Sequence, residues 1–295
     1  MLVSIYLHCL GAPMEASRVA VCTAYLLLCM FVCSCMMIVA HSRASAMSEY
    51  PPLPDCFHKL TPAWIDRGMK LCEVIVMSLI VLLVSVLFLR KDRLIIICRI
   101  CSVTGSVFLI RALAIFLTAI PIPHQSFDCK DQGAFQGFSD FFRSAIILFF
   151  SGGLTINGAK MCGDYMFSGH TSIVTLECLF LLEYWPSKLN GIIFRVTLVL
   201  VNITATVFIL LAREHYTVDV FIAVVICVIT FRYYHALMKM PAQFSFIFPT
   251  FYIAEQQNGC ESSKNTFHIF EWPISYPQWH SIVNSLNGNI VKKSL

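Results

Sequence analysis

The chain has 295 residues, of which 58% are hydrophobic and 13% are charged, and its formal net charge is +4. Soluble domains carry about 25% charged residues, so this composition excludes an ordinary soluble enzyme. The positive charge is spread along the chain and forms no basic stripe, so we expect no nucleic-acid partner. The composition predicts a polytopic, membrane-embedded protein.

Apolar runs along the chain predict an all-α fold with six transmembrane helices, since a span takes about 20 mostly apolar residues. We place the spans at 18–40, 70–90, 94–120, 170–186, 192–212 and 217–238. The first run exceeds the roughly 7–15 apolar residues of a signal peptide and lacks a small-residue cleavage site, so we interpret it as a retained anchor. The resulting organisation is a short N-terminal tail at 1–17, a six-span domain at 18–240 and a C-terminal cytosolic tail at 241–295.

Two long connections, 41–69 and 121–169, separate the early spans. Within the second, the apolar stretch 144–156 is short and interrupted by two glycines, which favours a re-entrant or interfacial segment over a full span. With this stretch excluded, three spans precede His170. Both termini then lie on the membrane face opposite to His170.

The cysteines fall into two groups. Four lie inside the first span, where free cysteine packs as a small hydrophobe: Cys22, Cys29, Cys33 and Cys35. Three lie in the connections and could form a disulfide in an oxidising compartment: Cys56, Cys129 and Cys162. Which two of these three would pair is left open.

Ionisable residues converge at one predicted membrane face. His170 begins the fourth span and His215 follows the fifth, so two consecutive antiparallel spans bring both histidines together. Asp219 lies one helical turn after His215, and we expect its carboxylate to hold one ring nitrogen of that histidine. A histidine held in this way can act as a nucleophile or as a base. Because charged groups near a membrane indicate function, we add Asp164 and Glu214 to the site.

Four strings occur in an order that resembles the motif regions of the sphingomyelin synthase family, a branch of the lipid phosphate phosphatase-like superfamily. They are "YPPLPD" at 50–55, "RICSVTGSVFLIR" at 99–111, "CGDYMFSGHT" at 162–171 and "HYTVDVFIAVVICVITFRYYH" at 215–235. The resemblance implies six spans around a lipid-phosphatase-like catalytic core. It implies an enzyme that moves the head group of phosphatidylcholine or phosphatidylethanolamine to ceramide and releases diacylglycerol.

The resemblance also implies residue roles. His215 would attack the phosphorus and form a phosphohistidine, and Asp219 would orient His215. His170 would protonate the departing diacylglycerol oxygen and then activate the ceramide hydroxyl. Arg111 is a candidate phosphate contact, or a structural partner of an acid such as Glu73. The chemistry implies no cofactor and no metal.

The predicted identity of the transferred head group depends on residue 214, which precedes the second histidine. Sphingomyelin synthases are expected to have Asp there, whereas Glu214 resembles the related proteins that make ceramide phosphoethanolamine. A primary ammonium favours carboxylates such as those of Asp164 and Glu214, while trimethylammonium favours aromatic faces, which Tyr165 and Tyr216 could supply. We expect a preference for ethanolamine, with choline left open.

Two alternatives remain beside the transferase: a phospholipase C-type hydrolase that passes the head group to water, and a catalytically inactive lipid-binding scaffold. The resemblance implies a membrane of the Golgi or endoplasmic reticulum, or the plasma membrane, with a lumenal or extracellular site and cytosolic termini. The related proteins carry an N-terminal oligomerisation domain, for which we expect no room here. The resemblance therefore leaves open whether the chain forms an oligomer.

Overall fold

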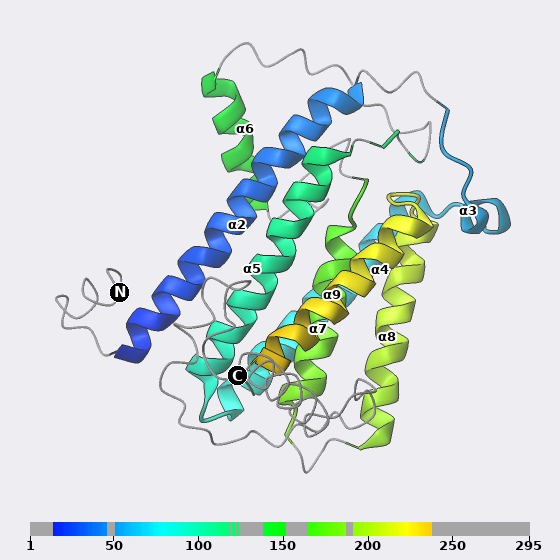
Figure 1. Cartoon of the computed structure of the whole chain (residues 1–295). Helices are drawn as coiled ribbons and strands as arrows, with labels where there is room; N and C mark the ends of the chain where they lie inside the picture. The colour runs from blue at the N-terminus through cyan, green and yellow to red at the C-terminus, as the bar shows by residue number, and fades with distance from the viewer. Residues whose placement is uncertain are drawn as a thin grey trace, which may run out of the picture. The chain divides into compact units, whose positions relative to one another are not determined.

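A computed structural model describes residues 14–45, 51–118, 120–121, 123, 138–151, 165–186 and 191–237. Every regular element in these ranges is a helix, as the composition predicts (Figure 1). The helices are α2 (Met14–Ser45), α3 (Cys56–Leu60), α4 (Ile65–Leu89), α5 (Arg93–Leu117), α6 (Phe138–Ser151), α7 (Gly169–Tyr184), α8 (Ile192–Leu211) and α9 (Thr217–Leu237). Most of the predicted tail regions, 1–13 and 241–295, lie outside the described residues.

Five of the six predicted spans are confirmed by length and composition. Among the described residues, α2, α4, α5, α8 and α9 are long and apolar enough to cross a membrane. The predicted fourth span is α7, which has 16 residues. It rises about 24 Å, less than the roughly 30 Å hydrocarbon core. Because α7 contacts α4, α5, α8 and α9, it lies inside the bundle, where neighbouring helices replace lipid.

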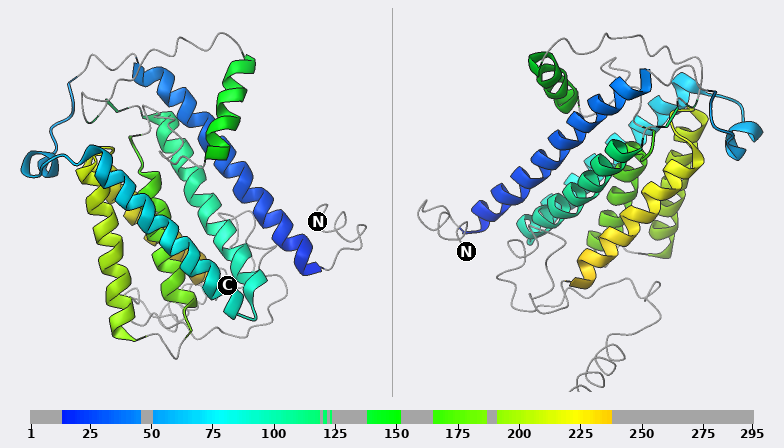
Figure 2. Two further views of the ribbon diagram at one scale, coloured as in Figure 1. Left: turned by 180° about the vertical axis from the view of Figure 1, so that it is seen from behind. Right: turned by 45° about the horizontal axis from the view of Figure 1, so that its top comes forward.

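The short helix α6 covers part of the stretch predicted to be re-entrant or interfacial. It begins at Phe138, six residues earlier than the apolar stretch at 144–156, and has 14 residues. Its rise is about 21 Å, too short for a crossing. Ala145 and Leu148 pack against Ile38 of α2, and Figure 2 shows the two helices from further sides. Residues 152–156 are not described, so the re-entrant path stays a prediction.

Helices α2 and α5 run side by side in the same direction. In the first half of each helix, Thr23 Oγ1 lies 3.9 Å from Cys101 Sγ. Near their last turns, Arg43 Nη1 donates a hydrogen bond of 2.6 Å to the carbonyl of Phe116. The cysteines of α2 belong to this packing: Cys22, Cys29 and Cys33 are buried free thiols and Cys35 is a partly buried one, which confirms the packing prediction.

The directions of the other helices place both histidines at one end of the bundle. Trp64 N at the start of α4 donates to Leu211 O at the end of α8 at 2.7 Å. Tyr184 Oη and His235 Nε2 lie 2.9 Å apart at the ends of α7 and α9, which run parallel. The starts of α7 and α9 therefore share the end where α8 finishes (Figure 1).

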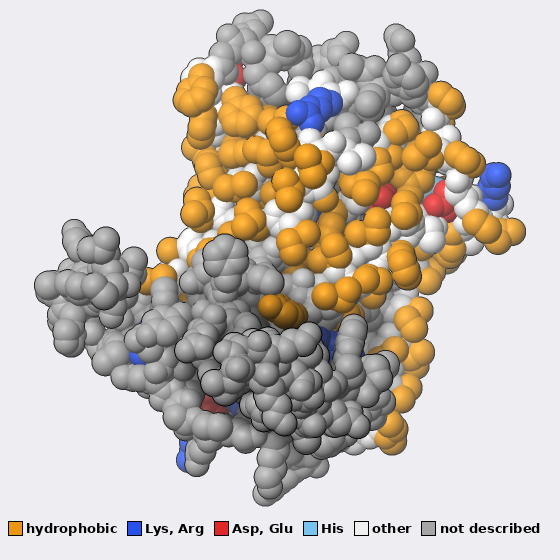
Figure 3. Space-filling view, in the orientation of Figure 1, with side chains coloured by type: hydrophobic (Ala, Val, Ile, Leu, Met, Phe, Trp, Pro, Cys, Tyr) orange, Lys and Arg blue, Asp and Glu red, His pale blue; other side chains and the backbone are white. Residues whose placement is uncertain are grey.

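The described surface is strongly apolar. Large side chains on α4, α5, α8 and α9 are exposed, among them Val81, Leu113, Ile203 and Phe221. Hydrophobic side chains cover much of the described part of the face in Figure 3. A soluble monomer rarely exposes such continuous apolar area. Together with the five long helices, this surface identifies a multi-pass membrane protein.

Candidate active site

The "SGH" string forms the start of α7. Ser168 is the N-cap, and its Oγ accepts a hydrogen bond from Thr171 N at 3.3 Å, the role for which serine is preferred. Gly169 follows, and a Cβ at this position would lie 3.1 Å from Arg111 Cζ. The glycine therefore allows the arginine to lie against the helix start. His170 is the second residue of the helix.

His170 faces a buried glutamate from another helix. Its Nε2 lies 3.9 Å from Glu73 Oε1, and Glu73 is only 2% exposed in the middle of α4. The sequence alone suggests Glu73 only as a partner for Arg111. An acid inside a long apolar run was the signal that could have assigned it to the site.

His215 lies in the connection between α8 and α9, here called the His215 loop, residues 212–216. The side chain is buried, and its ring centroid lies 6.3 Å from that of Tyr165, edge to face. Burial, then the charges of Arg111 and His170, lower the pKa of His215 to about 3, against an opposing interaction with the Tyr165 backbone. The imidazole is therefore neutral at physiological pH. Its interaction with His170 brings the two predicted histidines into one site.

Asp219 makes a different contact from the one expected. Its Oδ2 accepts a hydrogen bond of 3.0 Å from the backbone N–H of Tyr216. Tyr216 precedes α9, so Asp219, three residues later, satisfies the helix start as the acidic member of a capping box does. His215 Nδ1 is buried without a hydrogen-bond partner among the described residues. The expected contact with Asp219 is therefore not made through that nitrogen.

Arg111 lies beneath the start of α7. Its Nε donates a hydrogen bond of 2.9 Å to the Phe167 carbonyl, and its Nη1 lies 2.9 Å from Cys33 Sγ. The side chain is buried and interacts electrostatically with both His170 and His215. The structure thus places the Arg111 guanidinium, a candidate phosphate contact, beside the two histidines.

The remaining predicted residues differ in their surroundings. Tyr216 is buried, and its hydroxyl donates to Pro121 O at 3.0 Å and accepts from Leu53 N at 3.1 Å. That hydroxyl is therefore engaged within the fold. Glu214 is partly exposed in the His215 loop. Asp164 lies outside the described residues, as do Cys129 and Cys162, whereas Cys56 is an exposed free thiol.

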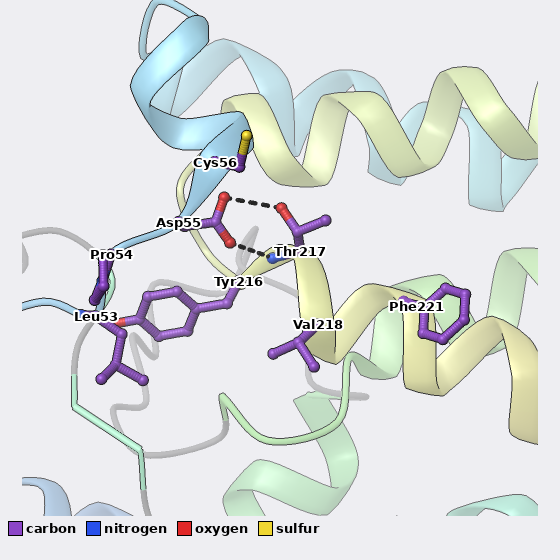
Figure 4. Close-up of a pocket in the computed structure, with 8 residues that line it drawn as sticks. All are labelled: Leu53, Pro54, Asp55, Cys56, Tyr216, Thr217, Val218 and Phe221. Atoms are coloured by element: carbon purple, nitrogen blue, oxygen red, sulfur yellow. Dashed lines mark hydrogen bonds between the residues drawn. The ribbon is translucent and has the colours of Figure 1, made fainter.

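A cavity of about 450 Å³ lies beside the start of α9 (Figure 4). Its lining comes from the end of the first motif and the first turns of α9: Leu53, Pro54, Asp55, Cys56, Tyr216, Thr217, Val218 and Phe221. Most of these side chains are apolar, and Leu53, Val218 and Phe221 are exposed. The cavity is therefore at a surface that lipid can reach, one residue along the chain from His215.

Comparisons with known proteins agree with this geometry. The family model described as PAP2 superfamily C-terminal matches residues 161–236, which hold both histidines and Asp219. The chain is 36% identical over 252 residues to sphingomyelin synthase-related protein 1 of Mus musculus, a match that covers 83% of this chain and 50% of that protein. The human protein of the same name is 36% identical over 250 residues, covering 83% and 58%.

A second group of relatives has a more specific name. The chain is 30% identical over 282 residues to phosphatidylcholine:ceramide cholinephosphotransferase 1 of Rattus norvegicus, covering 91% of this chain and 65% of that protein. The chain spans about half to two thirds of the length of these relatives. It carries the PAP2 superfamily C-terminal domain, and it is a homologue of the sphingomyelin synthases and the sphingomyelin synthase-related proteins.

Proposed function

We propose that this chain transfers the phospho-alcohol head group of a glycerophospholipid to ceramide, through a phosphohistidine at His215. The observation that carries the proposal is the buried, neutral imidazole of His215 beside Arg111 and His170. A neutral imidazole has the free electron pair that attack on phosphorus needs. The relatives' names support ceramide as acceptor, since one group is named as phosphatidylcholine:ceramide cholinephosphotransferases.

In the first half-reaction, a ring nitrogen of His215 attacks the phosphorus of the donor phospholipid. The bond between phosphorus and the glycerol oxygen breaks, and protonated His170 gives that oxygen a proton, which releases diacylglycerol. Glu73, 3.9 Å from His170 Nε2, stabilises the imidazolium form before this transfer. General acid catalysis of this kind contributes about 10²–10⁴-fold to a rate.

In the second half-reaction, neutral His170 takes the proton of the primary hydroxyl of ceramide. The ceramide oxygen attacks the phosphohistidine, the phosphorus–nitrogen bond breaks, and His215 returns to its neutral form. His170 ends protonated, ready for the next donor. One histidine thus serves as acid and then as base without any net uptake of protons.

Arg111 and the start of α7 would hold the phosphoryl oxygens. The guanidinium carries a fixed positive charge beside both histidines. A helix start also presents backbone N–H groups and a partial positive charge, which favour an anion. The donor phosphate is a diester with one negative charge, for which this pair of contacts suffices.

The head group and the compartment belong to the same proposal. Glu214 in the His215 loop, with Asp164, would accept hydrogen bonds from the primary ammonium of phosphatidylethanolamine, and phosphatidylcholine remains the second donor. The basic turn of Arg90, Lys91 and Arg93 lies at the end of the bundle opposite to His215. Because cytosolic loops are enriched in Lys and Arg, we place the site on the lumenal or extracellular face of a Golgi, endoplasmic reticulum or plasma membrane.

The test is expression of the chain in membranes that lack sphingolipid synthases, with fluorescent ceramide and either phosphatidylcholine or phosphatidylethanolamine. A ceramide phospholipid that disappears in a folded His215→Ala variant supports the transferase, and chromatography of the product identifies the head group. Diacylglycerol release that does not depend on ceramide would instead indicate the hydrolase. No product from folded protein with either donor would favour a lipid-binding scaffold.

A further inference from the structure

The first motif is tied to the start of α9 by one carboxylate. Asp55 Oδ2 accepts the backbone N–H of Thr217 at 2.8 Å, and Oδ1 accepts its hydroxyl at 2.9 Å (Figure 4). Oδ1 also accepts the N–H of His58 at 3.1 Å, which caps α3. One side chain therefore joins the starts of two helices that are far apart in the sequence.

Other contacts from the same region fasten the His215 loop on both sides of the histidine. After His215, the hydroxyl of Tyr216 accepts the backbone N–H of Leu53 at 3.1 Å. Before His215, Arg213 Nη2 donates to the carbonyl of Thr61 at 2.6 Å. Arg213 has a φ of 59°, a left-handed conformation that residues other than glycine rarely adopt. Residues 51–64 thus hold the His215 loop in a backbone conformation that the loop alone would not favour.

The Asp55 carboxylate is suited to this contact because it stays ionised. Partial burial acts to raise its pKa, but hydrogen bonds from Thr217 and His58 outweigh burial and lower the pKa below the usual 3.8. Hydrogen bonds to an ionised acceptor are about twice as strong as neutral ones. A negative charge at the first turn of α9 is also favoured by the helix dipole.

We propose that Asp55 is a positioning residue for transfer, which fixes the direction of the His215 ring through Thr217. The inference rests on the proposed function. The two backbone N–H groups that follow His215 are each bound by a carboxylate: Tyr216 N by Asp219 and Thr217 N by Asp55. A nucleophile displaced by about 1 Å can lose about 100-fold in rate. Releasing Thr217 should therefore slow the chemical step.

Asp55 also lines the cavity beside α9, so its charge could instead bind the cationic head group of the donor. The two roles differ in what they predict for Thr217. Thr217 has no charge to offer a head group, but its hydroxyl is half of the contact that holds the loop. Breaking the pair from the Thr217 side therefore separates positioning from direct binding.

The experiment uses the purified full chain in phospholipid vesicles with ceramide. We expect Asp55→Asn and Thr217→Val each to lower kcat about 10- to 100-fold, with the KM for donor phospholipid within about 3-fold of wild type. The double variant should be no slower than the slower single variant, because both substitutions break the same contact between Asp55 and Thr217. Thr217→Ser keeps the hydroxyl and should retain kcat. Thr204→Val, which removes an exposed hydroxyl on α8, is the matched control.

Additive losses in the double variant, or a raised KM with unchanged kcat in Asp55→Asn, would overturn the positioning role. Hydrogen exchange gives a second readout that needs no activity. The amides of Tyr216 and Thr217 should exchange about 10-fold faster in Asp55→Asn and unchanged in Asp92→Asn, whose carboxylate makes no cap hydrogen bond at α5. If the wild-type protein makes no transfer product, the proposed function is refuted. The hydrogen-exchange rates would still decide whether Asp55 holds the His215 loop.

Discussion

Glu73 Oε1 lies 3.9 Å from His170 Nε2, with the carboxylate on α4 and the imidazole on α7. Both side chains come from helices that pack against each other. Burial and the charge of Arg111 favour the neutral imidazole of His170, and the nearby Glu73 carboxylate opposes them by favouring the protonated form. Glu73 is therefore the group that supports the acid role proposed for His170 in the first half-reaction.

Replacing Glu73 by Gln should lower kcat about 10- to 100-fold, a part of the 10²–10⁴-fold that acid–base catalysis supplies. The amide keeps the size of the side chain but removes the charge that stabilises the imidazolium. Steady-state turnover of fluorescent ceramide measures the effect. Glu183→Gln, at the far end of α7 from His170, should retain activity. Wild-type kcat in Glu73→Gln would remove this residue from the mechanism.

The long helices, and the end of the bundle that carries both histidines, could be predicted from sequence, because both follow from local patterns. Apolar runs locate α2, α4, α5, α8 and α9, and the alternation of spans brings His170 and His215 to one end. Contacts between distant segments could not be predicted in this way. Glu73 reaches His170 only because α4 and α7 pack together, which no spacing within either helix reveals.

The partner of Asp219 shows a second limit. A spacing of four residues predicts a contact with His215 only if both residues belong to one helix. Helix α9 begins at Thr217, so His215 precedes it, and the carboxylate binds the N–H of Tyr216 instead. The position of a helix start thus changes which groups a side chain can reach.

The buried His215 should make the stability of the chain sensitive to acid. Its pKa is about 3 in the folded chain, against about 6.5 when unfolded. Below pH 6.5 the unfolded chain takes up a proton that the folded chain does not, so stability falls as pH decreases from about 6.5 toward 3, and is unaffected above that range. The slope is at most about 1.4 kcal/mol per pH unit.

His215→Asn should therefore lose less thermal stability than wild type between pH 6.5 and pH 4.5, while making no transfer product. Thermal unfolding of the purified protein in detergent, at intervals of one pH unit, measures the difference. Between pH 7.5 and pH 8.5 the gap in Tm between the two proteins should stay constant. Equal acid sensitivity in both proteins would show that His215 titrates normally.

Gly68 lies where α4 packs tightly against the end of α8. A Cβ at this position would lie 2.6 Å from the carbonyl oxygen of Phe208, and a backbone atom cannot move aside as a flexible side chain can. We expect Gly68→Ala to destabilise the fold by about 1–3 kcal/mol. Gly191→Ala is the matched control, because no described residue lies within 4 Å of its added methyl group. Equal Tm values for the two variants would contradict this packing.

Glu214 tests the choice of head group. Shortening it to Asp should move its carboxylate away from the ammonium of a bound ethanolamine head group while leaving the charge of the site unchanged. We expect Glu214→Asp to raise the ratio of phosphatidylcholine to phosphatidylethanolamine used as donor, by about 3- to 10-fold, the range that about 0.6–1.4 kcal/mol of differential binding gives. Competition between the two donors in mixed vesicles, followed by separation of the ceramide products, measures that ratio. Because only the length of one carboxylate changes, total turnover should fall less than the ratio shifts. An unchanged ratio would mean that Glu214 does not set the preference between the two head groups.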